Sequence, residues 1–355
     1  MDAVWLGVMV KLPESDLCDV VRRAEKDLLA LKGHRIFFTG GTGFIGVWML
    51  EVLCQANRTL DLGVQVTALT RDPSRFQARF QHLVESGRIT LVAGDVRSLE
   101  PDGNRYDSVI HAATDASAAL NRDNPLQMAD TIVEGTRRTL DLARQSGAGK
   151  VLMMSSGGIY GKFAPDITHI REDSICSPDP LDPYYTYSES KRMAELLCAI
   201  YAKQFGLQVP VARIFALAGP LLPLDTHFAL GNFVGDALAG RTVRVGGDGT
   251  QVRSYLYAAD LVVWLLAIMV RGQSSRAYNV GSDQGVTIGD LAHTVARLSP
   301  TPVSVHIAGR VDASNPVSYY VPDVDRARRE LGLDVSVSLE EAITRMIAWH
   351  RSEGL

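Results

Sequence analysis

The chain has 355 residues, and its 36 basic and 40 acidic side chains give a formal net charge of −4 at pH 7. Hydrophobic residues make up 46% and charged residues 21%, as in ordinary globular proteins, which excludes a fibrous or disordered chain. No basic excess is available to bind a phosphate backbone, and no apolar run reaches the roughly 18 residues that a membrane span needs. We therefore expect no nucleic-acid partner and no membrane insertion.

The cysteines and the first residues indicate where the protein works. Its four cysteines lie far apart and form no CxxC pair, which argues against a disulfide framework and against a structural zinc site. The histidines and carboxylates show no metal-ligand spacing, so we expect no metal. The first residues include an acid, Asp2, and lack the basic start of a signal peptide. The sequence thus predicts a reduced, cytoplasmic protein.

An amphipathic helix is predicted ahead of the first strand, over residues 13–31. Apolar side chains recur there at three- and four-residue steps, and Gly33 marks the end. Because this helix precedes the first strand, we treat residues 1–33 as an N-terminal helical appendage. An apolar helix face usually packs on the body of its own chain, and a contact with a second copy is the alternative.

From residue 34 to 214, short apolar runs alternate with helical patterns. Such alternation predicts an α/β fold with a parallel sheet covered on both faces, of the doubly wound Rossmann type that binds nucleotides. Helices are predicted between the strands, at 45–56, 125–145 and 187–205 among others. The predicted strands are 35–39, 64–69, 89–93, 108–112, 151–155 and 209–213.

Beyond residue 214 the pattern changes. Loops rich in Pro and Gly separate shorter elements, and two helix starts carry capping-box patterns, at Thr287 and at Ser338. We expect residues 215–355 to form mainly a smaller C-terminal lobe, with some segments returning to the main sheet.

A glycine-rich turn, TGGTGFIG at 39–46, follows the first strand directly. Its glycines allow a tight turn, close approach of a pyrophosphate to the backbone, and close packing of helix on strand. The helix that begins here would direct free N–H groups and its positive dipole end at the phosphates. Since the turn lies between an apolar strand and an apolar helix, it predicts a dinucleotide site. Its residues are Gly40, Gly43, Phe44, Ile45 and Gly46.

The end of the second strand bears on the choice between NAD and NADP. An acid at this tip binds the ribose of NAD, but the chain has Thr70 there, followed by Arg71, and an arginine suits the 2′-phosphate of NADP. The sequence therefore favours NADP slightly, while Asp72 leaves NAD open. Asp95, after the third strand, is a candidate to accept a hydrogen bond from adenine, with a plain turn as the alternative.

A candidate catalytic pair lies on the predicted helix 187–205. Tyr187 and Lys191 are four residues apart and therefore share a helix face. A free Tyr has a pKa near 10. To act as a base near neutral pH its pKa must fall by about three units, which needs roughly 4 kcal/mol of stabilisation of the phenolate, and a nearby ammonium helps to supply it. Ser156 ends the fifth strand, where its hydroxyl could orient a substrate hydroxyl beside the Tyr oxygen. We predict Ser156, Tyr187 and Lys191 as the catalytic residues.

With these residues the chain resembles the extended short-chain dehydrogenases/reductases, in particular the NAD(P)-dependent nucleotide-sugar epimerases and dehydratases. The resemblance spans about residues 34–345. It rests on TGGTGFIG at 39–46, GDV at 94–96, HAA at 111–113, SSGGIYG at 155–161, YSESK at 187–191, RIFALAGP at 213–220 and GDGTQVRSYLYAADL at 247–261.

The resemblance implies a C-terminal lobe that binds a nucleoside-diphosphate sugar, and a homodimer formed through a helix bundle, for which 187–205 is a candidate. Asn232 and Arg253 match positions that hold the diphosphate, and Thr114 and Ser156 would face the sugar. His111 would be buried or adjacent to the cofactor. Beyond the glycine turn, the expected cofactor contacts are Arg71, Asp95, Val96, Ala112, Ala113, Tyr187 and Lys191.

Several departures from the family pattern bear on the reaction. Members that dehydrate or decarboxylate usually carry an acid one or two places after the catalytic Ser or Thr, whereas this chain has Gly157 and Gly158, which cannot transfer a proton. Ala216 and Ile132 stand where Asn is usual, and an Arg before the last Pro-Asp pair is missing. Candidates to replace these contacts are Tyr319, His227 and Asp225.

The favoured interpretation is epimerisation at C4 through a transient 4-keto sugar. A 4-ketoreductase that consumes NADPH is the alternative that Arg71 favours. A 4,6-dehydratase or a UDP-uronate decarboxylase would use the same ketone and ranks lower because of the two glycines. A dinucleotide sensor without chemistry is disfavoured, because Ser156, Tyr187 and Lys191 are all present.

Overall fold

The computed structural model of the chain describes residues 10–114, 117–161, 166–174, 178–226, 228–312 and 316–354. The chain divides into two compact units. The first consists of Met1–Ile159, Pro178–Arg213 and Val262–Tyr278, and the second of Tyr160–Ser177, Ile214–Leu261 and Asn279–Leu355. The chain passes between the units more than once, so neither is one continuous stretch.

The central sheet has seven strands in the order β11-β6-β5-β4-β1-β2-β3. Strand β1 pairs in parallel with β2 on one side and with β4 on the other, so that Phe38 lies opposite both Ala68 and Ile110. The strands are β1 (Arg35–Thr39), β2 (Gln65–Thr70), β3 (Ile89–Ala93), β4 (Ser108–His111), β5 (Lys150–Ser156), β6 (Val211–Ile214) and β11 (Ala277–Val280).

This strand order confirms the predicted Rossmann-type α/β fold. All six predicted strands form, and β11 is a segment from the C-terminal part of the chain that joins the same sheet. The order reverses between β1 and β4. In such sheets ligands bind outside the carboxyl ends of the strands at the point of reversal. A ligand is therefore expected to bind at the segments that follow β1 and β4.

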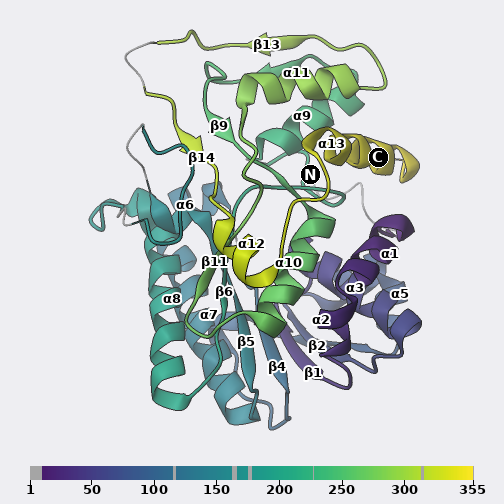
Figure 1. The fold of residues 1–355 in the computed structure, drawn as a ribbon, viewed down its shortest axis with the longest axis vertical. Coiled ribbons are helices and arrows are strands. Elements are labelled where there is room, and N and C mark those ends of the chain that lie inside the picture. The colour runs from purple at the N-terminus through teal and green to yellow at the C-terminus, as the bar shows by residue number, and fades with distance from the viewer. Residues whose placement is uncertain are drawn as a thin grey trace. The chain divides into compact units, whose positions relative to one another are not determined.

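Long helices flank the sheet. Helices α7 (Pro125–Ser146) and α8 (Thr186–Phe205) pack side by side and both contact β5 (Figure 1). No helix in the described part of the chain is long and apolar enough to cross a membrane. The remaining helices of these segments are α3 (Phe44–Leu60), α4 (Pro73–Arg79), α5 (Gln81–Glu85), η1 (Val96–Ser98), α6 (Ala118–Asp123), η2 (Gly157–Tyr160), η3 (Pro183–Tyr185) and α10 (Ala258–Arg271).

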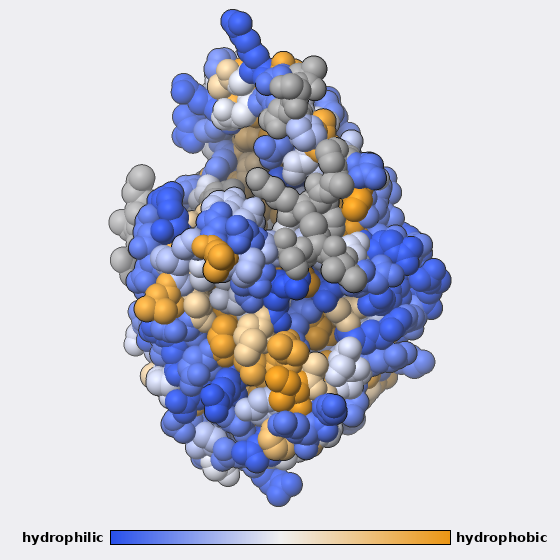
Figure 2. Space-filling view, turned by 90° about the vertical axis from the view of Figure 1, so that its left-hand side faces the viewer, coloured by the Kyte–Doolittle hydropathy of each residue, from blue (hydrophilic) through white to orange (hydrophobic). Residues whose placement is uncertain are grey.

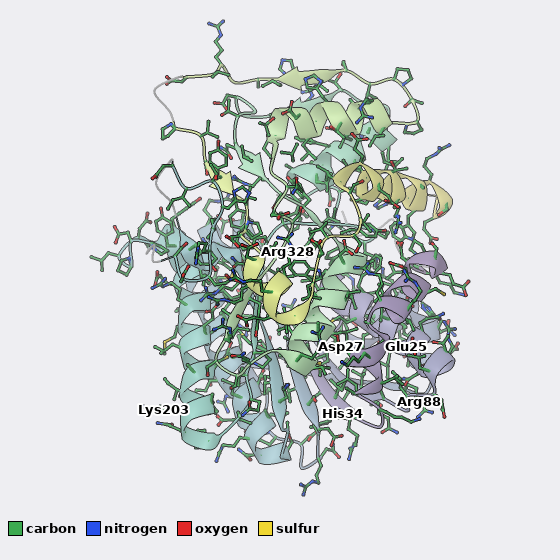
Figure 3. All side chains as sticks on the ribbon, viewed as in Figure 1. Glu25, Asp27, His34, Arg88, Lys203 and Arg328 are labelled. Atoms are coloured by element: carbon green, nitrogen blue, oxygen red, sulfur yellow. The ribbon has the colours of Figure 1, made fainter. Side chains whose placement is uncertain are left out.

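The N-terminal segment forms two short helices rather than the one predicted over 13–31. Helix α1 (Glu14–Arg23) and helix α2 (Glu25–Leu29) are separated at Ala24, and both pack on α3. Leu17, Val20, Val21 and Leu28 of these helices are buried, whereas Leu29 is 45% exposed. Asp27 of α2, labelled in Figure 3, forms an ion pair of 2.8 Å with Arg271 at the end of α10.

The described part of the second unit contains short strands and the helices α9 (Ala229–Leu238), α11 (Ile288–Leu298), α12 (Asp325–Leu331) and α13 (Leu339–Ser352). The two predicted capping patterns are confirmed, because Thr287 Oγ1 accepts from the N–H of Asp290 and Ser338 Oγ accepts from the N–H of Glu341. The strands are β7 (Leu217–Ala218), β8 (Val243–Val245), β9 (Val252–Arg253), β10 (Leu256–Tyr257), β12 (Val286–Thr287), β13 (Val305–Ile307) and β14 (Tyr319–Tyr320).

One buried histidine makes the stability of the fold depend on pH. His350 of α13 is 1% exposed, and neither of its ring nitrogens has a hydrogen-bond partner among the described residues. Burial lowers its pKa from 6.5 to about 4. The unfolded chain therefore binds a proton at this residue below pH 6.5, whereas the folded chain does so only near pH 4.

We predict that the free energy of unfolding falls by about 3 kcal/mol as the pH drops through this window, and that His350→Phe removes this part of the decrease. Urea unfolding of both proteins at pH 7 and at pH 4.5 measures the effect. His293→Ala is the matched control, because His293 lies exposed on α11. Equal pH dependence in the wild type and His350→Phe would contradict the prediction.

Candidate active site

The glycine turn joins the end of β1 to the start of α3 and is packed without room for side chains at two positions. A Cβ atom added at Gly40 would lie 2.6 Å from the backbone of Ala112 and Ala113, and one added at Gly46 would lie 2.4 Å from Gly41. Gly40 also has a φ of +76°, which favours glycine. The structure thus brings the glycine turn into contact with the HAA segment at the end of β4. The turn and the HAA segment were predicted separately to contact the cofactor.

Gly43 differs from Gly40 and Gly46 because neither its backbone conformation nor the packing around it requires a glycine. Its φ of −83° suits any residue, and a Cβ atom there would meet only the carbonyl oxygen of Gly40, at 3.5 Å. Gly43 is the N-cap of α3, and Phe44 and Ile45 form the first turn. The first N–H groups of a helix have no partners within it and bind phosphate well. A glycine here leaves that end open, so these residues fit the pyrophosphate of a dinucleotide.

The segment at the end of β2 carries an exposed arginine and a carboxylate that caps the next helix. Asp72 is the N-cap of α4, and its Oδ1 accepts a hydrogen bond of 2.9 Å from the N–H of Arg75. Thr70 is buried and its hydroxyl accepts from Thr42. Arg71 remains exposed at the tip. Asp72, which left NAD open in the sequence, therefore caps α4 through one of its two carboxylate oxygens.

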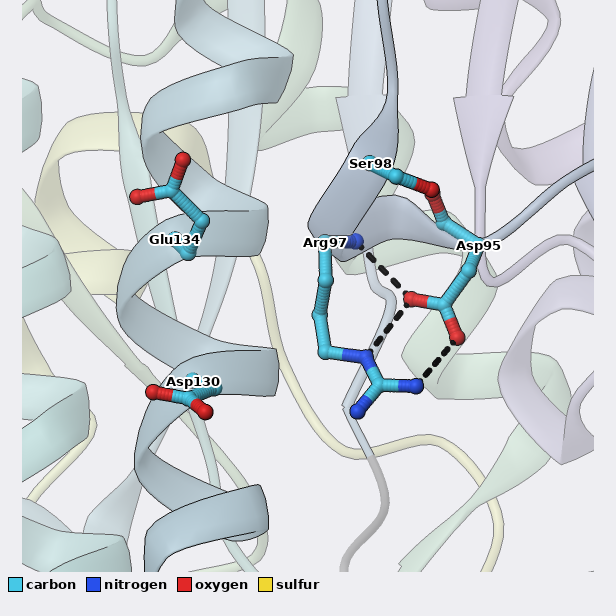
Figure 4. A pocket seen from close by; sticks show the side chains of 5 residues that line it. All are labelled: Asp95, Arg97, Ser98, Asp130 and Glu134. Atoms are coloured by element: carbon cyan, nitrogen blue, oxygen red, sulfur yellow. Dashed lines mark hydrogen bonds and ion pairs between the residues drawn. The ribbon is translucent and has the colours of Figure 1, made fainter.

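Asp95 lies in a small polar pocket formed by η1 and α7 (Figure 4). The pocket is lined by Asp95, Arg97, Ser98, Asp130 and Glu134. Both carboxylate oxygens of Asp95 accept hydrogen bonds from Arg97, at 2.8 and 2.9 Å. These bonds lower the pKa of Asp95 to about 2. Asp95 thus combines the turn-forming role with a permanent charge, and its contact with adenine stays a prediction.

Val96 is part of the packing rather than of an open surface. Its side chain is 7% exposed and belongs to a core cluster with residues of α7. A Cβ atom added at Gly135 of α7 would lie 2.9 Å from Val96 Cγ1, so a glycine is needed for η1 and α7 to approach. Ile132, where the family usually has Asn, is buried in the same cluster. At this position the chain uses an apolar core residue in place of a polar one.

His111 holds the ends of β1 and β4 to α7. Thr136 donates its hydroxyl proton to the carbonyl of Ile132, so it accepts from His111 Nε2 at 3.0 Å. His111 Nδ1 can then accept from Thr39 Oγ1 at 2.7 Å. Burial, assisted by the charge of Lys191, lowers the pKa of His111 to about 3. The imidazole is therefore neutral and positions the segments on either side of the dinucleotide turn.

The predicted catalytic residues lie together. Ser156 ends β5, and its Oγ accepts a hydrogen bond of 3.0 Å from the N–H of Gly158. Burial raises the pKa of Tyr187, while a hydrogen bond with Ser156 acts in the opposite direction. A Cβ atom added at Gly158 would lie 3.2 Å from the Tyr187 ring and 3.3 Å from Ser156 Oγ. Position 158 thus faces both hydroxyl-bearing residues, and it carries no side chain.

Lys191 is buried and holds its ammonium near these residues. It is 4% exposed, and its Nζ donates to Thr114 Oγ1 at 2.8 Å and to the carbonyl of Met154 at 2.9 Å. Burial lowers its pKa to about 8, against the nearby charge of Glu195. An ammonium has three donors, so one stays available beyond these two bonds among the described residues. The predicted sugar contact Thr114 is thus a direct partner of Lys191.

Glu195 was missed by the sequence-based prediction. It lies one helical turn after Lys191, forms an ion pair of 2.7 Å with Arg213, and accepts a hydrogen bond from Ser155 Oγ. Its spacing of four from Lys191 was the available signal. Arg213 lies in β6, 18 residues further along the chain, and could not be paired with Glu195 without the fold.

The predicted diphosphate contacts belong to the second unit. Arg253 of β9 is partly buried, which lowers its pKa. Its guanidinium donates hydrogen bonds to the carbonyl of Val252 and to Gln251 Oε1, and it lies over the ring of Tyr320. No carboxylate pairs with it among the described residues, so its charge suits an anionic ligand. The amide of Asn232 donates to the carbonyl of Thr226 at 2.8 Å.

The candidates that were to replace missing family contacts lie in different places. Tyr319 lies in β14, beside β9, and Asp225 lies in the loop before α9. Ala216 is partly buried, and its carbonyl accepts from the N–H of Leu256. His227 lies outside the described residues.

The chain belongs to the NAD dependent epimerase/dehydratase family, whose model matches residues 36–281. It is 31% identical over 319 residues to UDP-glucuronic acid decarboxylase 1 of Xenopus tropicalis, covering 90% of this chain and 72% of that protein. The resemblance to the extended short-chain dehydrogenases/reductases is thereby confirmed, and the chain is an enzyme of this NAD-dependent class.

Solved structures share the fold. The UDP-glucose 4-epimerase of Thermotoga maritima superposes with a TM-score of 0.73 at 24% identity, covering 90% of this chain and 100% of that one. The dTDP-glucose 4,6-dehydratase of Streptomyces venezuelae gives a TM-score of 0.75 at 24% identity, covering 90% of this chain and 97% of that one. At this identity the likeness concerns the fold alone.

We predict that Gly43→Val raises the dissociation constant of the dinucleotide at least tenfold and leaves the thermal midpoint within about 2 °C, because the new side chain enters only the open space at the helix end. Isothermal titration and thermal unfolding measure the two quantities. The matched control is Gly46→Val, which must displace the Gly41 backbone and should destabilise the fold by about 1–3 kcal/mol. Unchanged dinucleotide affinity in Gly43→Val would contradict this site.

Proposed function

We propose that the enzyme modifies a nucleoside-diphosphate sugar through a transient 4-keto intermediate, and that the reaction is epimerisation at C4. The observation that carries this proposal is the cluster of Ser156, Tyr187 and Lys191 beside a position, Gly158, that has no side chain. Membership of the NAD dependent epimerase/dehydratase family supports the class of reaction.

Ser156 and Tyr187 have distinct tasks in the cluster. Ser156 orients the C4 hydroxyl through its own hydroxyl group, and Tyr187 takes up the proton of that C4 hydroxyl. Burial raises the pKa of Tyr187 and the hydrogen bond with Ser156 opposes this shift, so formation of the phenolate would rely on Ser156 and on the positive charge of a bound oxidised nicotinamide. When bound, the nicotinamide ring supplies the hydride acceptor and donor that this chemistry requires. Tyr187 then returns the proton to the opposite epimer.

The two glycines favour epimerisation over dehydration. Dehydration of a 4-keto sugar needs a group that removes the C5 proton and assists the departure of water. Position 158 faces Tyr187 and Ser156 directly, and a glycine there offers no such group. Epimerisation needs no further acid or base beyond Tyr187, because the hydride returns to C4 and the proton returns to the oxygen on C4.

Decarboxylation is the second candidate, because the chain is 31% identical to UDP-glucuronic acid decarboxylase 1 of Xenopus tropicalis. In a 4-keto uronate the carboxylate is β to the ketone, which can itself accept the electron pair when CO2 leaves. The missing acid at position 158 therefore weighs less against decarboxylation than against dehydration. This reaction instead needs a uronate as substrate.

The second unit would hold the nucleotide part of the substrate. Arg253 has no carboxylate partner among the described residues and would bind the diphosphate with its planar fork, assisted by Asn232. Thr114 would face the sugar from the end of β4. This assignment gives residues 34–214 mainly to the dinucleotide and residues 215–355 mainly to the substrate.

A homodimer through α8 accounts for an exposed apolar surface. Met193, Leu196 and Phe205 of α8 are 41, 55 and 48% exposed. Figure 2 shows hydrophobic side chains gathered on the side of the first unit where α8 lies in Figure 1. Apolar surface of this kind on a long helix suits a contact with the same helix of a second copy.

The reaction is tested by incubating the enzyme in D2O with UDP-glucose, UDP-N-acetylglucosamine, dTDP-glucose and UDP-glucuronate. We predict a product of unchanged mass, separated by chromatography, that carries no deuterium on carbon. Decarboxylation would lose CO2 and dehydration would lose water, and both would introduce a solvent deuteron at C5. Either of those products, or a stoichiometric consumption of NADPH, would overturn the epimerase proposal in favour of that reaction.

The role of Tyr187 is tested by the same assay. Tyr187→Phe should lower turnover by about 10²–10⁴-fold, the usual contribution of general acid–base catalysis. Tyr184→Phe is the matched control, because Tyr184 is 72% exposed. Unchanged turnover in Tyr187→Phe would contradict the catalytic assignment.

We also propose that Arg71 binds the 2′-phosphate of NADP, because it is exposed at the tip of β2 while Asp72 is occupied as a helix cap. Such a cofactor preference would suit the ketoreductase alternative. We predict that Arg71→Ala weakens NADPH binding about 10–100-fold and changes NADH binding less than twofold. Arg88→Ala is the control, since Arg88, labelled in Figure 3, is an exposed arginine just before β3. Equal effects on both cofactors would contradict the proposal.

A further inference from the structure

Helix α8, which carries Tyr187 and Lys191, begins without a cap of its own. Its N-cap position is Tyr185, whose side chain makes no capping hydrogen bond. The first N–H groups of a helix have no partner within the helix, and a polar side chain at the N-cap normally accepts from one of them. Something else must therefore stabilise the turn that carries Tyr187.

Asn121, in α6, supplies this cap from 66 residues upstream. Its Oδ1 accepts a hydrogen bond of 2.9 Å from the backbone N–H of Tyr187. Its Nδ2 donates a hydrogen bond of 2.9 Å to the carbonyl of Tyr184. One amide group thus joins η3 to the first turn of α8. Only a side chain with an acceptor and a donor on one short stem can make both bonds.

The segment that contains Asn121 also contacts Lys191. It begins at Thr114, directly after β4, where Thr114 Oγ1 accepts from Lys191 Nζ at 2.8 Å. It reaches Asn121 within eight residues, of which 115 and 116 lie outside the described part. One segment therefore contacts the backbone of Tyr187 at one end and the side chain of Lys191 at the other.

We propose that Asn121 is a positioning residue for Tyr187, which it holds through the first turn of α8. The inference rests on the proposed function only in its kinetic readout. Asn121 does not touch the reacting atoms in this arrangement. It acts through the first turn of α8, whose small displacements move the Tyr187 hydroxyl relative to Ser156.

The expected effect is large for a partly buried contact. Catalysis depends on reacting groups held in position, and a misplacement of about 1 Å can lower a rate about 100-fold. Loss of the Asn121 amide leaves the N–H of Tyr187 without its acceptor and the carbonyl of Tyr184 without its donor. The dinucleotide turn after β1 makes no contact with this amide, so cofactor binding should be preserved.

The test compares Asn121→Ala, Asn121→Asp and Asn124→Ala in the full-length enzyme. Asn124 is the matched control because it is an exposed Asn three residues further on, whose side chain caps α7 through bonds to Gln127 and bonds to no other described residue. The first readout is backbone amide exchange over residues 184–191, followed by mass spectrometry. The second is kcat and KM with the substrate found above, and the third is dinucleotide affinity.

We expect faster exchange at 184–191 in Asn121→Ala than in either the wild type or Asn124→Ala. We also expect kcat to fall at least tenfold, with KM and dinucleotide affinity within about twofold, since the loss concerns placement of Tyr187 rather than binding. Asn121→Asp keeps the acceptor and adds a charge that suits a helix N-terminus, so it should recover the protection and part of the rate.

The inference is overturned if Asn121→Ala and Asn124→Ala show the same exchange and the same kcat. It is also overturned if KM and dinucleotide affinity change as much as kcat does, because the effect would then be a general loss of structure. If the wild type turns over no nucleotide sugar, the proposed function fails, and amide exchange alone still decides whether Asn121 positions this turn.

Discussion

The buried ammonium of Lys191 constrains the site more than any other group. A charge removed from water needs oxygen partners, and Lys191 finds them at the carbonyl of Met154 in β5 and at Thr114 after β4. These partners fix the start of α8 relative to the ends of two strands. Ser156, two residues beyond Met154, and Tyr187, one turn before Lys191, are brought together as a consequence.

The field around Lys191 determines whether it keeps its charge. Burial alone would reduce the charged fraction near neutral pH, and the carboxylate of Glu195 opposes that shift. Glu195 in turn is held by Arg213 and Ser155, so strand β6 contributes to the charge state of a residue on α8. The charge state of Lys191, one of the proposed catalytic residues, thus depends on Glu195 and on the side chains that hold Glu195.

What the sequence alone could predict was whatever depends on neighbours along the chain. The parallel sheet, the glycine turn and the four-residue spacing of Tyr187 and Lys191 are local patterns, and the structure contains each of them. The contacts of Asn121 with Tyr187, and of Glu195 with Arg213, join segments whose proximity exists only after folding. Asp72 shows the same limit, because an acid near a strand tip can bind a ribose or cap a helix, and only the backbone distinguishes the two.

The absence of a side chain at Gly158 bears on the proposed reaction. It removes a proton-transfer group from a position that faces Tyr187 and Ser156, which disfavours elimination of water. Elimination requires such an added group, and a glycine withholds it. The outcome of the shared ketone would then depend on how the sugar is held rather than on a further acid.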